Sequence, residues 1–259
     1  MPNNDFLLCI GHRGAMGHAP ENTLASMQKA LELGTPCIEV DVYRVDGELI
    51  VFHDDRLERK TNGVGYVCER SFEYLRTLDA GGGQRIPTLR EVCEVIGFQA
   101  CINIELKGPG TAAPVAAQIT DLVANGWNRD AFLVSSFNHR QLADVKQFDK
   151  RIQLGVLIDG LPVDETRLAE ELGAFSVHPS MEFLDQRFVD DAHSRNLKVY
   201  AYTVNHSEDI VRMHRLGVDG VFTNFPERVL AMYPKRDITN RWTGRADLPV
   251  ISNVSGELD

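Results

Sequence analysis

Short apolar runs alternate with amphipathic segments along most of this 259-residue chain. Apolar runs bounded by Gly, Pro, Asn or Asp are typical of strands, and apolar positions three or four residues apart are typical of helices. The pattern predicts strands at 6–12, 37–45, 49–53, 101–107, 131–137, 152–158, 175–178, 198–204 and 220–223. It predicts helices at 21–33, 88–96, 112–124, 138–148, 163–172, 185–195, 207–216 and 226–232.

This alternation of strand and helix predicts an α/β fold, specifically a closed (β/α)8 TIM barrel. About eight such units imply a parallel sheet whose faces are covered by helices, and a chain of this length suits closure into a barrel. A doubly wound open sheet is the alternative, disfavoured by the number of units and by the lack of a GxGxxG turn. We therefore expect one domain over residues 1–259, with its active site at the carboxyl ends of the strands.

The strands at 37–45 and 49–53 are predicted to form a hairpin, with Asp46 and Gly47 at the turn. A two-residue turn would place His53 opposite Val40, whereas a three-residue loop with a left-handed glycine would pair His53 with Asp41. Because a shift of one residue moves every side chain to the other face, the functional interpretation favours the second register.

Two segments lie outside the repeating pattern. Residues 56–86 have weak periodicity and several glycines, and they are predicted to form a small inserted subdomain that caps the barrel mouth. The polar tail, residues 234–259, is expected either to dock on the barrel or to fray.

Composition and charge narrow the classes of partner. The formal net charge of −10 disfavours nonspecific binding to nucleic acid or to an anionic membrane. Five cysteines without a metal-binding spacing suit a reducing compartment. The chain shows neither a signal-peptide pattern nor an apolar run of membrane-spanning length, so a cytoplasmic location is expected. A homo-oligomer is left open.

Three acids interrupt apolar strands. Glu39 and Asp41 are two residues apart, so both point to one face of their strand, and Glu105 repeats the anomaly on another strand. Like charges that close need a cation between them or must take up a proton. Oxygen ligands favour one divalent cation, Mg²⁺ or Ca²⁺. The alternatives are ion pairs with neighbouring strands and, for Glu105, a pair with Lys107.

Two histidines end predicted strands beside these acids. His12 and His53 titrate near neutral pH, so one could take a proton from a nucleophile while the other protonates a leaving oxygen. Arg13 could hold phosphoryl oxygens with two hydrogen bonds, and Lys107 would add a second cation facing the phosphate. We therefore interpret both histidines as catalytic residues and both cations as substrate-binding residues.

Further candidates carry a structural alternative. Glu21 either contacts the metal shell or a substrate hydroxyl, or orders the start of a helix together with Asn22. Tyr202 and Phe225 either form an apolar wall for a small polyol or close the top of the barrel. His178 ends a strand and is left undecided between lining the pocket and a structural role.

These positions form motifs in a recognisable order. The motifs are HRG (12–14), PENT (20–23), ExD (39–41), HDD (53–55), NIELK (103–107), TVN (203–205) and GVDGVFTNFP (217–226). Together they resemble the glycerophosphodiester phosphodiesterase family. The resemblance implies a (β/α)8 barrel with a small insertion and a divalent cation held by the residues matching Glu39, Asp41 and Glu105. It also implies acid–base chemistry by His12 and His53, and hydrolysis of glycerophosphodiesters to sn-glycerol 3-phosphate and an alcohol.

Two alternatives stay open beside this hypothesis. A lysophospholipase D or phospholipase-type phosphodiesterase could use the same scaffold, and it would need an apolar entrance. A non-catalytic phosphate-binding barrel is the third hypothesis. The nucleophile, either water or a neighbouring glycerol hydroxyl, also stays open.

Overall fold

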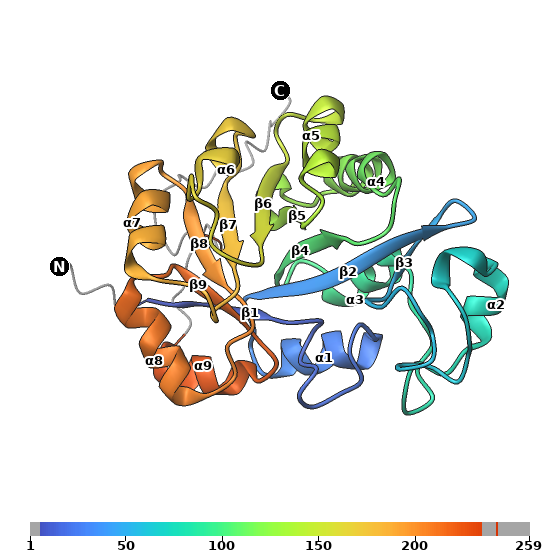
Figure 1. Ribbon diagram of the computed structural model, residues 1–259. Helices are drawn as coiled ribbons and strands as arrows, with labels where there is room; N and C mark the ends of the chain where they lie inside the picture. Colours follow the sequence, from blue (N-terminus) through green and yellow to red (C-terminus); the bar gives the residue numbers. More distant parts are fainter. Residues whose placement is uncertain (1–5, 235–241, 243–259) are drawn as a thin grey trace, which may run out of the picture.

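The computed structural model describes residues 6–234 and Trp242 (Figure 1). Its strands are β1 (Leu8–Gly11), β2 (Cys37–Val45), β3 (Glu48–Val51), β4 (Cys101–Leu106), β5 (Phe132–Ser136), β6 (Gln153–Ile158), β7 (Ser176–Pro179), β8 (Lys198–Ala201) and β9 (Gly220–Thr223). Its α-helices are α1 (Leu24–Glu32), α2 (Phe72–Thr77), α3 (Leu89–Ile96), α4 (Ala112–Ala124), α5 (His139–Phe148), α6 (Arg167–Glu171), α7 (Gln186–Ser194), α8 (Ser207–Leu216) and α9 (Pro226–Met232). Two 3₁₀ turns are η1 (Val67–Glu69) and η2 (Arg129–Ala131).

The strands close into a barrel. Neighbouring strands follow the order β1-β9-β8-β7-β6-β5-β4-β2-β3, and β1 also pairs with β2, which completes the ring. All these pairings are parallel except β2–β3, which is antiparallel. The predicted (β/α)8 TIM barrel is therefore confirmed, with the helices packed around its outside in Figure 1.

The alternation of residues along β2 separates core from site. Ile38, Val40 and Val42 belong to the main hydrophobic core. Between them, Glu39 and Asp41 are buried on the opposite face, which points into the barrel. The sequence pattern thus assigned the two faces of this strand correctly.

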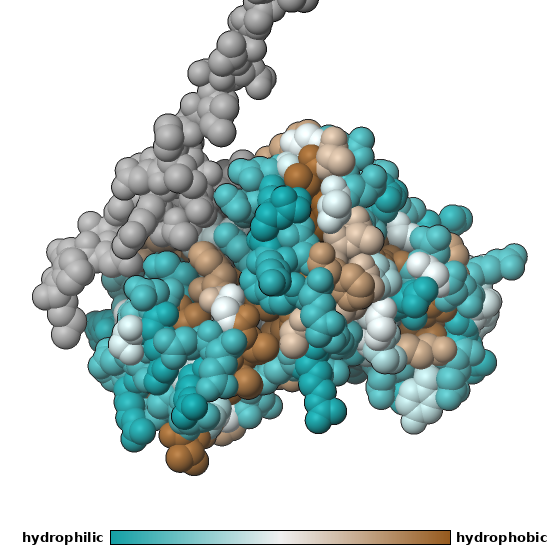
Figure 2. All heavy atoms as spheres, turned by 90° about the horizontal axis from the view of Figure 1, so that it is seen from above, coloured by the Kyte–Doolittle hydropathy of each residue, from teal (hydrophilic) through white to brown (hydrophobic). Residues whose placement is uncertain are grey.

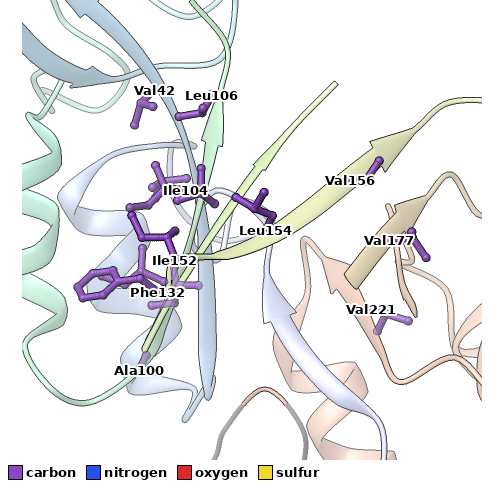
Figure 3. Packing of buried hydrophobic residues seen from close by; sticks show 14 of the residues in the cluster. Val42, Ala100, Ile104, Leu106, Phe132, Ile152, Leu154, Val156, Val177 and Val221 are labelled. Carbon is purple, nitrogen blue, oxygen red and sulfur yellow. The ribbon is translucent and has the colours of Figure 1, made fainter. Parts of the chain in front are cut away.

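The main hydrophobic core lies between the strands and the surrounding helices. Strand residues such as Ile104 and Leu106 share it with Val92 of α3 and Val115 of α4. Figure 3 shows Val42, Ile104 and Leu106 together in this packing. This core holds the strands in register and so fixes the positions of the side chains on their inner faces.

The predicted register of the hairpin is wrong. Val45 pairs with Glu48, so the turn has two residues, Asp46 and Gly47, both with positive φ (51° and 92°). Such a turn follows the right-handed twist of the two strands. The strand ends at Val51, and His53 lies beyond the ladder. The loop conformation, rather than strand alternation, therefore brings His53 to the inner side.

Residues 56–86, the predicted inserted subdomain, lie beside the β2–β3 hairpin (Figure 1). Their apolar side chains, with Leu57, Val67, Leu75 and Ile86 among them, share a separate cluster with Tyr43 of β2. The subdomain lies at the side of the barrel mouth, and none of residues 56–86 lines the central cavity described below.

The first helix begins later than expected. Thr23 is its N-cap, with its side-chain oxygen accepting a hydrogen bond from the N–H of Ser26 (3.2 Å). Asn22 has φ 57° and lies outside the helix. Residues 20–23 therefore form a loop that leads into the helix instead of its predicted first turn.

The tail lies mostly outside the described residues. Trp242 is buried in a second hydrophobic cluster, which also contains Leu8, Tyr200 and Phe222. Its carbonyl accepts a hydrogen bond from the hydroxyl of Tyr200 (2.6 Å). Among the described residues, no helix combines the length and apolar character needed to cross a bilayer. On the face in Figure 2, hydrophilic residues surround smaller hydrophobic areas.

Candidate active site

A cavity of about 230 Å³ opens where the strands end at the carboxyl side of the barrel. This is the end at which TIM-barrel enzymes carry their active sites. Most of the predicted site residues line it: His12, Arg13, Glu39, His53, Glu105, Lys107 and Tyr202.

The three acids converge as expected. Glu39, Asp41 and Glu105 each bring one oxygen to within 4.8 Å of the others. The register of β2 and β4 places Asp41 directly beside Glu105, which explains this proximity. The arrangement is dominated by hard, negatively charged oxygen donors.

The electrostatics of these acids fit a bound cation. Burial, then the charges of Asp41 and Glu105, raise the pKa of Glu39 well above its usual range. Burial followed by the charge of Glu105 raises the pKa of Asp41 to about 6. Glu39 Oε1 is buried and has no hydrogen-bond partner. A divalent cation would neutralise the repulsion and satisfy this oxygen, so the residues present can hold one.

Arg13 joins the acids to the loop that follows β1. Its backbone N–H donates to Glu39 Oε2 (2.8 Å), while its guanidinium pairs with Glu21 Oε1 (2.6 Å) and Asp41 Oδ2 (3.2 Å). Burial disfavours its charge, but the charges of Asp41, Glu39 and Glu21 outweigh this and raise the pKa of Arg13. Arg13 therefore stays cationic beside the cavity.

Gly14 allows the same loop to pack tightly on α1. It has φ 84°, and a Cβ at this position would lie 2.4 Å from Ser26 Oγ. In this close contact Ser26 Oγ donates to the carbonyl of Arg13 (2.8 Å). The helix thus fixes the backbone that carries Arg13.

His12 is held by a neutral amide. Its Nδ1 donates to Asn224 Oδ1 (2.7 Å), which leaves Nε2 with a free lone pair. Burial, followed by the charge of Arg13, lowers the pKa of His12 to about 3. The ring is therefore neutral at pH 7.

His53 is held by charged groups. Its Nδ1 donates to Asp54 Oδ1 (2.7 Å), and Lys107 Nζ lies 3.3 Å from its Nε2. Lys107 also donates to Glu105 Oε1 (3.0 Å). Burial lowers the pKa of His53, although Asp41 and Asp54 oppose this shift. The carboxylate of Asp54 adds a full negative charge beside the protonated ring, whereas His12 has only the neutral amide of Asn224.

Of the three remaining candidates for substrate binding, only Tyr202 lines the cavity. Tyr202 lines the cavity with its ring, while its hydroxyl donates to the carbonyl of Ile158 (3.1 Å). Glu21 contacts Arg13 instead of lining the cavity. The structure places Phe225 outside the lining, with its ring under the Arg228 guanidinium (3.9 Å).

His178 is not part of the cavity lining. It is fully buried inside the barrel, where its Nε2 lies 2.8 Å from Ser176 Oγ. Burial lowers its pKa to about 3, so this histidine is a neutral core residue. The structural interpretation of His178 therefore holds.

The comparisons with known proteins agree with this geometry. A model of the glycerophosphoryl diester phosphodiesterase family matches residues 12–228. The chain belongs to this family. The match begins directly after β1, covers every other strand, and includes all the predicted site residues.

Individual members of the family are similar over nearly the whole chain. A glycerophosphodiester phosphodiesterase from Caldanaerobacter subterraneus subsp. tengcongensis is 36% identical over 238 residues, covering 88% of this chain and 98% of the relative. Another from Bacillus subtilis is 31% identical over 249 residues, covering 86% and 85%. An Oleispira antarctica phosphodiesterase, solved in complex with the product sn-glycerol-3-phosphate, has a TM-score of 0.82 and 32% identity, covering 89% of this chain and 98% of that one. The predicted family and enzyme class are thereby confirmed.

Sequence reasoning did not predict the contacts that two asparagines of the PENT and GVDGVFTNFP motifs make in this site. Asn224 binds His12, and Asn22, interpreted as structural, donates its amide to Asp41 Oδ2 (2.8 Å). A signal for Asn224 was available, because β1 and β9 are neighbours and both His12 and Asn224 follow directly after them. No comparable signal existed for Asn22, whose contact depends on its left-handed backbone.

Proposed function

We propose that this protein hydrolyses glycerophosphodiesters to sn-glycerol 3-phosphate and an alcohol, with a divalent cation and with His12 and His53 as general base and general acid. The observation that carries the proposal is the pairing of two differently held imidazoles on one cavity with Arg13 and Lys107. The Oleispira antarctica relative binds sn-glycerol-3-phosphate, the product expected here.

The assignment of base and acid follows from the partners of the two rings. His12 is neutral at pH 7 and presents a free Nε2 lone pair, so it can take a proton from the attacking oxygen. His53 has the Asp54 carboxylate on Nδ1, which stabilises the ring once it is protonated. It can therefore deliver a proton to the leaving oxygen of the alcohol.

The cationic side chains would bind the phosphoryl group. The Arg13 guanidinium and the Lys107 ammonium oppose the negative charge of its oxygens, which grows in the transition state. Glu39, Asp41 and Glu105 would hold one Mg²⁺ or Ca²⁺ ion, which when bound supplies further positive charge against these oxygens.

The test couples glycerol 3-phosphate detection to hydrolysis of glycerophosphocholine. Replacing His12 or His53 by Ala should lower kcat about a thousandfold, because each removes one proton transfer. The control is His193→Ala, since His193 pairs with Asp219 away from the cavity and should keep full activity. Activity should vanish in EDTA and return with Mg²⁺ or Ca²⁺. More than a tenth of the activity in either active-site variant would remove that histidine from the mechanism.

A second substrate class has one observation in its favour. Phe137 lines the cavity, is 45% exposed, and packs edge-on against Tyr202 with ring centroids 5.9 Å apart. Such an apolar wall could contact the acyl chain of a lysophospholipid. Choline release from lysophosphatidylcholine, compared with release from glycerophosphocholine, separates the two. Faster release from the lysophospholipid would favour the second class.

A further inference from the structure

Two adjacent cationic side chains of the inserted subdomain form ion pairs with acids next to the active site. Arg59 and Lys60 belong to residues 56–86, which lie beside the barrel mouth and contribute no residue to the cavity lining. Each nevertheless pairs with an acid that holds one of the site residues. One contact reaches the acid beside His53, and the other reaches the acid beside Arg13.

Arg59 acts on His53 through Asp54. Its Nε donates to Asp54 Oδ2 (2.6 Å) and its terminal nitrogen to Asp54 Oδ1, so the guanidinium grips the carboxylate with two parallel bonds. The same carboxylate accepts from His53 Nδ1 (2.7 Å). Since a two-bond grip fixes the plane of the carboxylate, Arg59 determines how Asp54 meets the imidazole.

Lys60 acts on Arg13 through Glu21. Lys60 Nζ lies 2.5 Å from Glu21 Oε2, and the other oxygen of this carboxylate accepts from Arg13 (2.6 Å). Glu21 therefore bridges two cations and holds the Arg13 guanidinium between itself and Asp41.

Burial of the two acids distinguishes these pairs from ordinary surface ion pairs. The side chains of Asp54 and Glu21 are only 13% and 6% exposed. Replacing Arg59 or Lys60 by a neutral residue would leave the carboxylate of Asp54 or Glu21 buried without its partner, and this carboxylate could then rotate toward another group. By contrast, Arg56 in the same subdomain pairs with Glu58, and both of these side chains are well exposed. That pair contacts no site residue and is expected to contribute little.

We propose that Arg59 and Lys60 are positioning residues, through which the inserted subdomain sets the orientation of His53 and of Arg13. The inference rests on the proposed function, in which His53 transfers a proton and Arg13 binds the phosphoryl group. It gives the subdomain a role in the reaction although it lies outside the cavity. It also predicts that the two neighbouring residues affect different kinetic constants.

The test compares Arg59→Met and Lys60→Met, with Arg56→Met as the matched control. Arg59→Met should lower kcat about tenfold with KM within twofold, because proton transfer by His53 is disturbed after substrate has bound. Lys60→Met should raise KM about fivefold with kcat within twofold, because Arg13 loses its fixed direction. Arg56→Met should change neither constant by more than about twofold.

Further variants separate positioning from a general structural effect. Arg59→Lys keeps the charge but loses the second bond, so it should restore part of kcat, and it replaces Arg59→Met if that variant does not fold. Combining Arg59→Met with Asp54→Asn should cost no more than Asp54→Asn alone, since Arg59 acts through Asp54. The inference would be overturned if Arg59→Met and Lys60→Met both lowered kcat and raised KM to similar extents. It would also be overturned if both variants had the same kinetic constants as Arg56→Met.

The proposed function can fail separately. If His53→Ala keeps its activity, the acid–base mechanism is wrong whatever Arg59 does. If His53→Ala is inactive while Arg59→Met and Lys60→Met match the control, the mechanism stands and only the role of the subdomain is rejected.

Discussion

Replacing Glu39 by glutamine should stabilise the protein in the absence of divalent cations. Oxygens of Glu39, Asp41 and Glu105 lie within 4.8 Å of one another. Two unit charges at this separation repel by about 3 kcal/mol at an effective dielectric constant of about 20. Arg13, which donates to Glu39 Oε2, offsets part of this repulsion. Glutamine keeps the shape and the acceptor oxygen, so Glu39→Gln should raise the free energy of unfolding by roughly 1–2 kcal/mol.

The stability gain should depend on pH. Burial first, and the neighbouring acids second, raise the pKa of Glu39 well above its usual range and that of Asp41 to about 6. The folded state therefore binds these protons more tightly than the unfolded state. Without cations, the wild-type free energy of unfolding should fall as the pH rises from about 4 through about 6 and beyond. Because Glu39→Gln removes one of these groups, its advantage should grow over the same range and vanish near pH ~4.

Divalent cations should reverse the order of stability. A cation at a hundred times its Kd stabilises the wild type by about 2.7 kcal/mol, and the variant, which lacks one acidic ligand, gains much less. Urea unfolding followed by tryptophan fluorescence at pH 8, in EDTA and in excess Mg²⁺ or Ca²⁺, measures both effects. Glu48→Gln, on the exposed end of the hairpin, is the control for removing one negative charge from an acidic protein. The reasoning is refuted if Glu39→Gln is less stable than the wild type in EDTA, or if both gain equally from the cation.

Two further substitutions test the packing around the site. Gly155→Ala would place a Cβ 2.3 Å from His178 Cε1, so it should lower the free energy of unfolding by about 1–3 kcal/mol, measured from the urea midpoint. An unchanged midpoint would mean that His178 moves aside freely. Asn22→Gly keeps the backbone at φ 57° but removes the amide that donates to Asp41. It should weaken cation binding about tenfold in titration calorimetry, and equal affinity would show that Asp41 needs no such partner.

Local patterns were enough to predict the fold and the main chemical groups. The alternation of Ile38, Val40 and Val42 with Glu39 and Asp41 is a property of one strand, so the sequence shows which residues face inward. The number and order of strand–helix units likewise indicate a barrel. In a barrel, the ends of all parallel strands meet at one mouth, which explains why acids and histidines from separate strands converge.

Loop and hairpin details could not be derived in this way. The interpretation that required Asp41 and His53 to pair predicted a three-residue turn, whereas the backbone adopts the tighter two-residue turn at Asp46 and Gly47. His53 lines the cavity as expected, but the predicted register that was to bring it there is wrong. The reason is that His53 lies beyond Val51, where the ladder no longer constrains the chain.

The sequence by itself therefore determined the barrel, the acidic cluster and the two candidate histidines, because each strand and helix has a local pattern and a barrel gathers the ends of its strands at one mouth. Only the tertiary structure decided which partners those residues have. It showed that Asn224 holds His12, and that Arg59 and Lys60 reach Asp54 and Glu21 from the inserted subdomain. These contacts arise from barrel closure and from loop conformation, which bring distant segments together without leaving a periodic trace in the sequence.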